Sequence, residues 1–546
     1  MGGVDLHAPN PVHDDLGLHP EARWDRRNIG EANPGVSTPL SASWSRRTSQ
    51  SSQLRMFRLL GAIGDDELGG RDGLSSPYAG RLAAYVYGRR AIDAATVLGI
   101  LGRLPGVDAG ALEELIFGER SGVEVARLRA ARRVAAVART IRAVLRLPAW
   151  IDRRAPATLQ WWQATALAAH TADWSRARAL LDDAEERWRA DVALHSATAV
   201  FHTAFVDRIT AMAKGHLEPS AALHLVSGID DMAETGMLRS LWDVSQGISD
   251  LHRFLAVYGY YAPDEGELAT PSWRMDPSGL EPTLERYRTS PNDGPGLRTD
   301  TTRRAFDIAR SSLRPRLSLL HRLVFDRVLA GSRRYARTRE RSKAMMLQCT
   351  DATRAVVHRL GELLAAAGVL EQAADVYWLT IEELPEAKAG SDVRERIQER
   401  RQRHEAYFEL TVPSHFTAAD LVDPVAANGV ATDSESPVSG LGVSPGRLTG
   451  RAVVMRTPEN LDLQPDDVLV CESTDPGWAA MLSMVGGLVM DMGSALSHGA
   501  IVARELGIPC VAGTGDGTRR LRTGQWVRID GTTGEVEVVA APRAAQ

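Results

Sequence analysis

The sequence holds 546 residues, of which 44% are hydrophobic and 24% are charged, as is ordinary for a soluble globular protein with a large core. At roughly 150 residues per domain, this length indicates three or four structural units. The 64 Lys and Arg residues nearly balance the 69 Asp and Glu residues. The resulting net charge of −5 argues against nucleic acid as a partner, because phosphate backbones require a basic surface.

The cysteines and the apolar runs exclude further classes of protein. Cys349, Cys471 and Cys510 form no C-x-x-C motif, so the sequence predicts neither a disulfide framework nor a cysteine zinc site. The longest apolar run, residues 479–490, is too short to cross a bilayer, and the N-terminus lacks the apolar segment of a secretory signal. We therefore expect a cytoplasmic protein with no membrane partner and no metal site of its own.

Most of the first four-fifths of the chain is predicted to be helical, after a short N-terminal tail. Residues 1–45 are rich in Pro, Gly, Asn and His without periodicity, which is typical of a tail or linker. Residues 46–420 predict one large helical domain, because apolar residues recur three, four or seven apart, for example over 174–192. Over 351–368, Asp351 stands where a helix cap is expected and Gly368 where a helix ends.

The character of the sequence changes near the C-terminus. Residues 421–440 are small and polar, which predicts a flexible linker. Residues 441–542 contain six short β-rich runs and two helix-like pieces, which predict a compact α/β domain. The predicted fold class is therefore a large all-α domain followed by a small α/β domain.

One segment of this second domain, residues 493–514, carries chemistry. A Gly- and Ser-rich turn leads into a short helix, with Ser497 as the predicted N-cap, Gly507 at the C-terminal end and Pro509 just beyond it. His498 then lies in the first turn, where the helix dipole disfavours the imidazolium form and favours a phosphoryl group attached to the ring. A histidine in this position could accept a phosphoryl group and release it to a second acceptor.

The same residues resemble the swivelling phosphohistidine domain of the phosphoenolpyruvate-utilising enzymes. GSALSHGAIVARELGIPCVAG (493–513) is similar, without gaps, to the signature around the family's phosphorylated histidine. TDPGW (474–478) resembles the family's loop that faces the histidine, and GVSPGRLTGRAVV (442–454) resembles the opening of the domain. Leu496 replaces the threonine that many dikinases phosphorylate for regulation, so that form of control is not expected here.

The resemblance implies roles for five residues. His498 would be the nucleophile and phosphoryl carrier. Thr474 and the backbone N–H groups of Gly499 and Ala500 would contact the phosphoryl oxygens. Arg504 would add positive charge, although a surface ion pair with a nearby acid is an equally good interpretation of this residue.

A weaker resemblance extends upstream, and its layout is that of rifampin phosphotransferase without the ATP-grasp domain. Residues 360–384 and 339–343 resemble the central helical domain of that enzyme, as do residues 258–277. Residues 28–43 resemble the segment that joins the ATP-grasp domain to the helical domain.

Departures within the helical domain leave the acceptor open. Tyr260, Tyr261, Ser272 and Met275 all differ from the residues that relatives carry at these positions. Trp, Tyr and Arg in this region suit an apolar, polycyclic or polyketide-like ligand, although solvated charges and a packed Trp explain the same residues. The candidate substrate-binding residues are Glu265, Glu267, Trp273, Arg274, Arg339 and Lys343.

Two expected absences shape the functional hypothesis. No G-x-x-x-x-G-K-[ST] motif occurs, the residues before Asn28 are too few for an ATP-grasp domain, and no pyruvate-binding barrel follows the last domain. We therefore expect a separate ATP-grasp protein to supply the phosphoryl group from ATP and Mg²⁺, neither of which this chain would bind alone. The acceptor would be a hydroxyl-bearing small molecule, and phosphorylation could prepare that hydroxyl for elimination.

Two alternatives stay open. The chain could be a phosphocarrier or adaptor that signals through phospho-His498 without small-molecule chemistry. It could also be a decayed module that only binds a ligand, although the intact SHGAIVAREL segment argues against decay.

Overall fold

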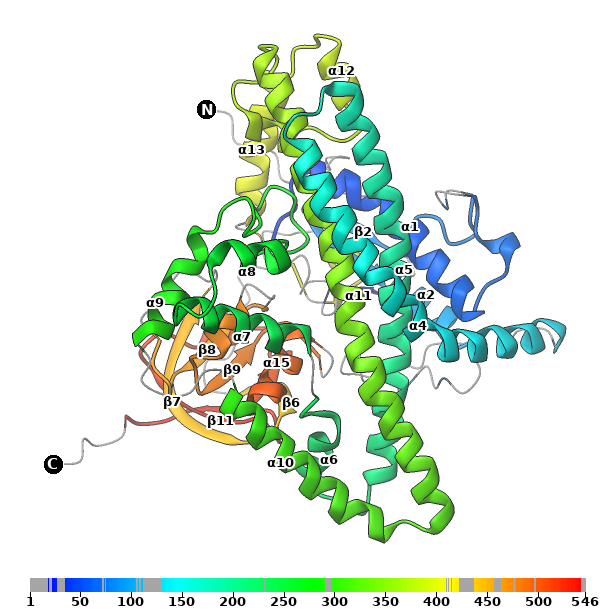
Figure 1. The fold of residues 1–546 in the computed structure, drawn as a ribbon, viewed down its shortest axis with the longest axis vertical. Helices are drawn as coiled ribbons and strands as arrows, with labels where there is room; N and C mark the ends of the chain where they lie inside the picture. The colour runs from blue at the N-terminus through cyan, green and yellow to red at the C-terminus, as the bar shows by residue number, and fades with distance from the viewer. Residues whose placement is uncertain are drawn as a thin grey trace.

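The computed structural model describes residues 18, 22–26, 35–70, 73, 75–104, 107, 110, 130–229, 232–289, 296–408, 410, 412–413, 415–421, 437–455, 463–474, 478–494 and 497–541. A large helical region comes first in the chain, and a small α/β unit follows it (Figure 1). The predicted fold class is confirmed.

Four long helices build the helical region. Helix α5 packs along α11 over much of its length, α4 packs against both of them, and α1 packs against α5 and α4. Asp173 caps the N-terminus of α5 and Ser318 caps that of α11, each by accepting a backbone N–H bond. The long helices are α1 (Pro39–Leu60), α4 (Ala130–Ala169), α5 (Trp174–Ala213) and α11 (Leu319–Ala366).

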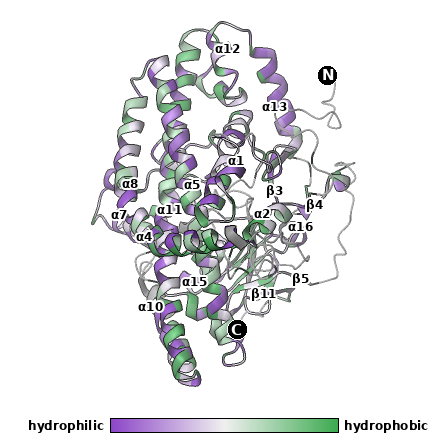
Figure 2. Cartoon of the chain, turned by 90° about the vertical axis from the view of Figure 1, so that its right-hand side faces the viewer, coloured by the Kyte–Doolittle hydropathy of each residue, from purple (hydrophilic) through white to green (hydrophobic). Residues whose placement is uncertain are grey.

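Shorter helices surround the long ones. The α-helices are α2 (Ala94–Leu101), α6 (Pro219–Leu223), α7 (Ala233–Ser245), α8 (Leu251–Tyr258), α9 (Glu281–Thr289), α10 (Gly296–Leu313), α12 (Leu384–Lys388) and α13 (Arg394–Phe408). The 3₁₀ helices are η2 (Asp65–Glu67), η3 (His224–Val226), η4 (Ser278–Leu280), η5 (Arg314–Arg316), η6 (Ala373–Trp378) and η7 (Ala418–Leu421). Figure 2 shows α13 as mostly hydrophilic, because Arg, Glu and Gln make up most of this helix.

Both helices anticipated from periodicity belong to longer ones. Residues 174–192 form the first half of α5, and residues 351–366 form the last turns of α11. Asp351 is thus an interior residue of α11 and not a cap, because the helical pattern continues far upstream of it. Gly368 does follow the helix end, with a left-handed φ of 75° that favours glycine.

A small sheet joins distant parts of the helical region. Its strand order is β2-β3-β1-β4, with β1 (Trp24–Asp25), β2 (Ala84–Val86), β3 (Arg89–Asp93) and β4 (His415–Phe416). Strand β1 and the start of α1 fall within residues 1–45, so this expected tail contains ordered structure. Most of residues 1–34 lie outside the described residues, as do residues 422–436 of the expected linker.

The α/β unit is built on one eight-stranded sheet with the order β5-β12-β11-β7-β8-β9-β10-β6. The four adjacent strands β7, β8, β9 and β10 are parallel, and the outer pairings are antiparallel. The strands are β5 (Val438–Ser439), β6 (Leu441–Ser444), β7 (Arg447–Met455), β8 (Val468–Cys471), β9 (Gly487–Met490), β10 (Cys510–Ala512), β11 (Trp526–Asp530) and β12 (Glu535–Val538). The unit also holds the short helices α14 (Ala479–Leu482), α15 (His498–Leu506) and α16 (Gly517–Arg520).

The α/β unit is docked against the helical region. In Figure 1 it lies beside α11, with α7, α8 and α9 above it and α10 below. One hydrophobic cluster spans both parts, since it includes Trp162 and Leu238 on the helical side and Leu482 and Val485 in the α/β unit. Across the same boundary, the Tyr287 and Ser483 hydroxyls lie 2.8 Å apart. Among the described helices, none combines the length and apolar character that a membrane crossing requires.

Candidate functional site

Helix α15 begins where the sequence predicted. Ser497 has an extended backbone conformation and its Oγ accepts a hydrogen bond from the Ala500 N–H at 3.3 Å. His498 is the first residue of the helix, and its side chain lies outside the described part of the structure. Gly507 ends the helix with a left-handed φ of 66°. The predicted cap, helix and stop are confirmed, because each depends on residues close in sequence.

Thr474 and Gly499 meet at the N-terminus of α15. A Cβ added at Gly499 would lie 2.3 Å from Thr474 Oγ1 and 2.6 Å from Met490 Sδ, so only glycine fits this position. Thr474 is buried, and its hydroxyl lies 3.5 Å from Met490 Sδ. Thr474, Gly499 and Ala500, predicted as phosphoryl contacts, are therefore brought together around the first turn. Leu496 and residues 475–477 lie outside the described residues.

Arg504 is buried rather than paired on the surface. Its guanidinium donates a hydrogen bond to the Val443 carbonyl at 3.1 Å. Burial lowers the pKa of Arg504 to about 10, despite the opposing charge of Glu505, so the side chain stays positive at neutral pH. This cation thus lies inside the boundary between the α/β unit and the helical region.

Helix α15 closes a cavity against the helical region. Ile501, Arg504 and Glu505 line it on one side, and His202 of α5 and Arg339 and Glu340 of α11 line it on the other. The cavity has a volume of about 70 Å³, which suits a reacting group rather than a whole drug-sized ligand.

The C-terminal end of α15 is pinned beside this cavity. Glu505 Oε2 accepts a hydrogen bond from the Ile229 N–H at 3.2 Å. The Glu505 carbonyl accepts another bond from the Thr302 hydroxyl, also at 3.2 Å. These two bonds fix the end of α15 to two separate segments of the helical region.

Two of the predicted substrate-binding residues, Arg339 and Lys343, lie on the face of α11 that meets α5. Arg339 forms an ion pair with Glu340 at 3.0 Å, and Lys343 lies 3.6 Å from the carboxylate of Glu265. Sequence spacing placed Arg339 and Lys343 on one helix face, and the fold adds Glu265 from a segment more than seventy residues earlier. All four charged side chains are at most 15% exposed.

Two histidines on α5 complete this polar seam between α5 and α11. His195 Nδ1 lies 3.1 Å from the Ser342 hydroxyl. Burial and the positive charges of Arg339 and Lys343 lower the pKa of His195 to about 3. Burial, Arg339 and Arg504 lower the pKa of His202 to about 3 as well, so both rings are neutral at pH 7.

Neither histidine was among the sequence-derived candidates. Their spacing of seven residues places them on one helix face, which is the signal that could have drawn attention to them. That signal is weak, because two histidines at this spacing are more often packed core residues. Only the approach of α11 and α15 shows that His202 lies among charged groups.

The remaining candidates lie in structural networks. Glu267 accepts hydrogen bonds from the Thr38 hydroxyl at 2.7 Å and the Ser41 hydroxyl at 2.6 Å, which secures the start of α1. Trp273 packs in the core against Tyr261.

Arg274 and Asp351 form a second such network. The Arg274 guanidinium is held by the Asp351 carboxylate at 2.8 Å and 3.2 Å. The same carboxylate also accepts the Trp162 ring N–H at 2.7 Å. Asp351 therefore joins three separate segments of the helical region.

Within the described residues, no group of three or more His, Cys, Asp or Glu side chains is arranged to hold a metal ion. Two cations, Arg339 and Arg504, line the boundary cavity together with the carboxylates of Glu340 and Glu505 and the neutral ring of His202.

Comparison with known families agrees with this geometry. Residues 463–534 match the model of the PEP-utilising enzyme mobile domain, which includes α15 and the strands around it. Residues 246–340 match the model of the rifampicin phosphotransferase fourth domain, which reaches from α8 to Arg339 and Glu340. The two matched segments meet at the boundary cavity.

Individual relatives include rifampicin phosphotransferases. A rifampicin phosphotransferase from Streptomyces sp is 31% identical over 58% of this chain and 38% of its own length. The rifampicin phosphotransferase of Bacillus subtilis is 28% identical over 53% of this chain and 34% of its own. An uncharacterized protein of Mycobacterium tuberculosis is 35% identical over 38% of this chain and 24% of its own. The chain thus matches well under half the length of these relatives.

Proposed function

We propose that this chain, which joins a PEP-utilising enzyme mobile domain to a rifampicin phosphotransferase-like helical region, carries a phosphoryl group on His498 and transfers it to a hydroxyl of a small molecule. The observation that carries the proposal is the cavity in which Arg504 of α15 meets Arg339 and Glu340 of α11. Phosphoryl transfer depends mainly on positioning and on positive charge around the transferred group, and this boundary supplies both.

The donor step would occur away from this cavity. A separate ATP-grasp protein would bind ATP and Mg²⁺ and phosphorylate His498, after which residues 421–440 would let the α/β unit return to the helical region.

On the carrier side, the start of α15 would hold the phosphoryl group. In this proposal the Thr474 hydroxyl and the Gly499 and Ala500 N–H groups would contact the phosphoryl oxygens. Thr474 and Ala500 would exchange their present bonds to Met490 Sδ and Ser497 Oγ for these contacts. The helix dipole adds a favourable partial charge at the same place. The cavity is lined by Ile501 and Glu505, which follow His498 by three and seven residues. This spacing places His498, Ile501 and Glu505 on one side of the helix.

On the acceptor side, Arg339 and Arg504 would stabilise charge on the moving phosphoryl group. Lys343 and Glu265 lie further along the same seam and would contact the acceptor. The acceptor is proposed to be a polycyclic or polyketide-like molecule, in keeping with the named activity of the relatives. Its product would be a phosphate ester, or an alkene if the ester is then eliminated.

The test uses the full chain, candidate ATP-grasp proteins and ATP labelled at the γ-phosphate. We expect an acid-labile, base-stable phosphoprotein that His498→Ala abolishes and the exposed-site control His358→Ala retains. Labelled chain is then offered hydroxyl-bearing compounds, beginning with rifampicin. Label that survives in His498→Ala would contradict the proposal, and label that passes only to another protein would identify a phosphocarrier instead.

A further inference from the structure

The cavity between α15 and the helical region contains one side chain that the proposed mechanism has not used. His202 is 7% exposed and lines the cavity, and its Nε2 atom has no hydrogen-bond partner among the described residues. A buried ring nitrogen without a partner is costly in a folded protein, so it requires an explanation. His202 shares its cavity with Arg339 and Glu340 of α11 and with Arg504 of α15.

We propose that His202 is the base that accepts the proton of the acceptor hydroxyl during phosphoryl transfer, an inference that rests on the proposed function. In this step the acceptor oxygen forms a bond to phosphorus while the bond between phosphorus and the protonated ring of phospho-His498 breaks. The electron pair of the broken bond stays on His498, which becomes a neutral ring. The hydroxyl proton moves to His202 Nε2, so charge and atoms balance.

The charges around His202 make it sensitive to the phosphoryl group. Arg339 and Glu340 face it from α11, and Arg504 and Glu505 face it from α15. In the absence of an anion, burial and the two guanidinium groups keep the ring neutral, as a base must be. A phosphoryl group between the guanidinium groups offsets their repulsion of a proton, so His202 becomes a better base when the phosphoryl group arrives.

Glu340 is the competing base in the same cavity. Its carboxylate forms an ion pair with Arg339 at 3.0 Å. His202 has no such neighbour in hydrogen-bond contact with Nε2. The two residues are therefore distinguishable by substitution.

The first experiment follows His202 directly by NMR of the full chain labelled with ¹⁵N-histidine, with His202→Gln to assign the signal. Without anion, we expect a neutral ring down to pH 5. Inorganic phosphate at saturation should move the titration of His202 towards neutral pH. A titration that phosphate leaves unchanged, or an absence of phosphate binding, would overturn the inference.

The second experiment measures transfer. The full chain is phosphorylated with phosphoramidate, and loss of the phosphoryl group to water and to glycerol is followed between pH 5 and 9. We expect His202→Gln to slow transfer about 100-fold or more and to flatten the pH profile, while the rate of Glu340→Gln remains pH-dependent. Gln retains a polar atom near the Nε2 position, so wild-type rates in His202→Gln would show a merely structural role and overturn the inference.

The design separates the two proposals. If the wild-type chain fails to take up phosphate on His498, the proposed function fails and the NMR result still stands on its own. If the wild-type chain is phosphorylated and transfers, and His202→Gln does so equally fast, only the role of His202 fails. Thermal unfolding of each variant, with His358→Gln as the control histidine, shows whether a rate change reflects loss of folded protein.

Discussion

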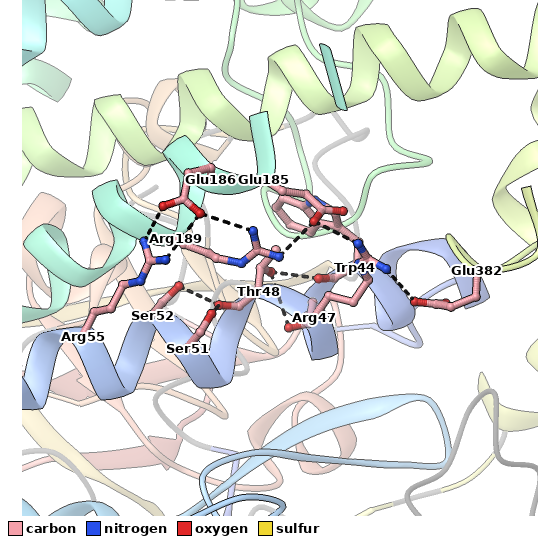
Figure 3. Close-up of polar contacts among 11 residues, drawn as sticks. Trp44, Arg47, Thr48, Ser51, Ser52, Arg55, Glu185, Glu186, Arg189 and Glu382 are labelled. Atoms are coloured by element: carbon pink, nitrogen blue, oxygen red, sulfur yellow. Dashed lines mark hydrogen bonds and ion pairs between the residues drawn. The ribbon is translucent and has the colours of Figure 1, made fainter. Parts of the chain in front are cut away.

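Helix α5 carries buried polar residues on two faces, and the two faces differ in how charge is balanced. Towards α1, each cation has a carboxylate partner: Arg189 lies 2.9 Å and Arg47 3.3 Å from Glu185, and Arg55 lies 2.8 Å from Glu186 (Figure 3). Figure 3 also shows that serines and threonines of α1 line this interface, and Thr48 and Ser52 donate to backbone carbonyls of their own helix.

Towards α11, Arg339 and Lys343 also have carboxylate partners, but two titratable rings lie among them. His195 and His202 are held neutral by burial and by cations on the neighbouring helices, and His202 lines a cavity. The first face consists of matched pairs that hold two helices together. The second face instead places two neutral histidines among charged side chains, and one of these histidines lines a cavity.

The largest effect should come from removing the positive charge of Arg339, which α11 contributes to the second face. Arg339→Met removes positive charge from the cavity, and we expect transfer from phospho-His498 to fall about 100- to 1,000-fold, because charge on the moving group is no longer stabilised. Single-turnover transfer measures this, with Arg341→Met as the control, since Arg341 is half exposed and pairs with Asp152. An equal loss of transfer rate in both variants would contradict the assignment of Arg339 to the transfer site.

Breaking the first face should affect stability instead. Glu185 is 3% exposed and holds both Arg47 and Arg189. Glu185→Gln leaves a buried guanidinium without its main partner, and we expect unfolding free energy to fall by about 3 kcal/mol. Urea unfolding measures the change. Phosphorylation of His498 should be unaffected in protein that remains folded. A large loss of phosphorylation would contradict a purely stabilising role for Glu185.

The pH dependence of stability should come from the second face. The pKa of His195 and His202 is about 3 in the folded chain, below the ordinary value of 6.5, so the unfolded chain binds more protons as the pH falls. Stability is therefore fully present above pH 6.5 and declines as the pH falls towards 3. Between pH 6.5 and 5 we expect a loss of about 2 kcal/mol for each histidine. Urea unfolding at both pH values should show a smaller decline in His202→Gln.

The smallest effect belongs to the exposed end of the first face. Glu186 is 39% exposed and Arg55 is 28% exposed, so solvent screens their ion pair. Glu186→Gln should lower the thermal midpoint by an amount equivalent to less than about 1 kcal/mol. A loss as large as that of Glu185→Gln would show that burial does not separate the two positions.

Local signals made the carrier segment predictable. Ser497 and Gly507 mark the ends of α15 through caps that involve residues only a few positions away. The same reasoning placed Arg339 and Lys343 on one face of a helix.

Sequence alone could not separate Glu265 from Glu267, two residues apart. Glu265 lies beside Lys343, whereas Glu267 secures α1 through Thr38 and Ser41. These partners are far away in sequence and come together only when the helices pack. Asp351 was wrongly predicted as a helix cap because α11 continues far upstream of it, and its actual partners Arg274 and Trp162 come from other segments.

The contacts that hold α15 against the helical region also set the free-energy cost of moving the helix away. Ile501 of α15 packs with Ile229, Met232 and Ala336 of the helical region in one buried cluster. Departure of the α/β unit would uncover these side chains, at up to roughly 1.5–3 kcal/mol for each of the larger ones. Any partner that took the place of the helical region would have to cover the same apolar side chains, because their exposure to water would otherwise oppose the movement.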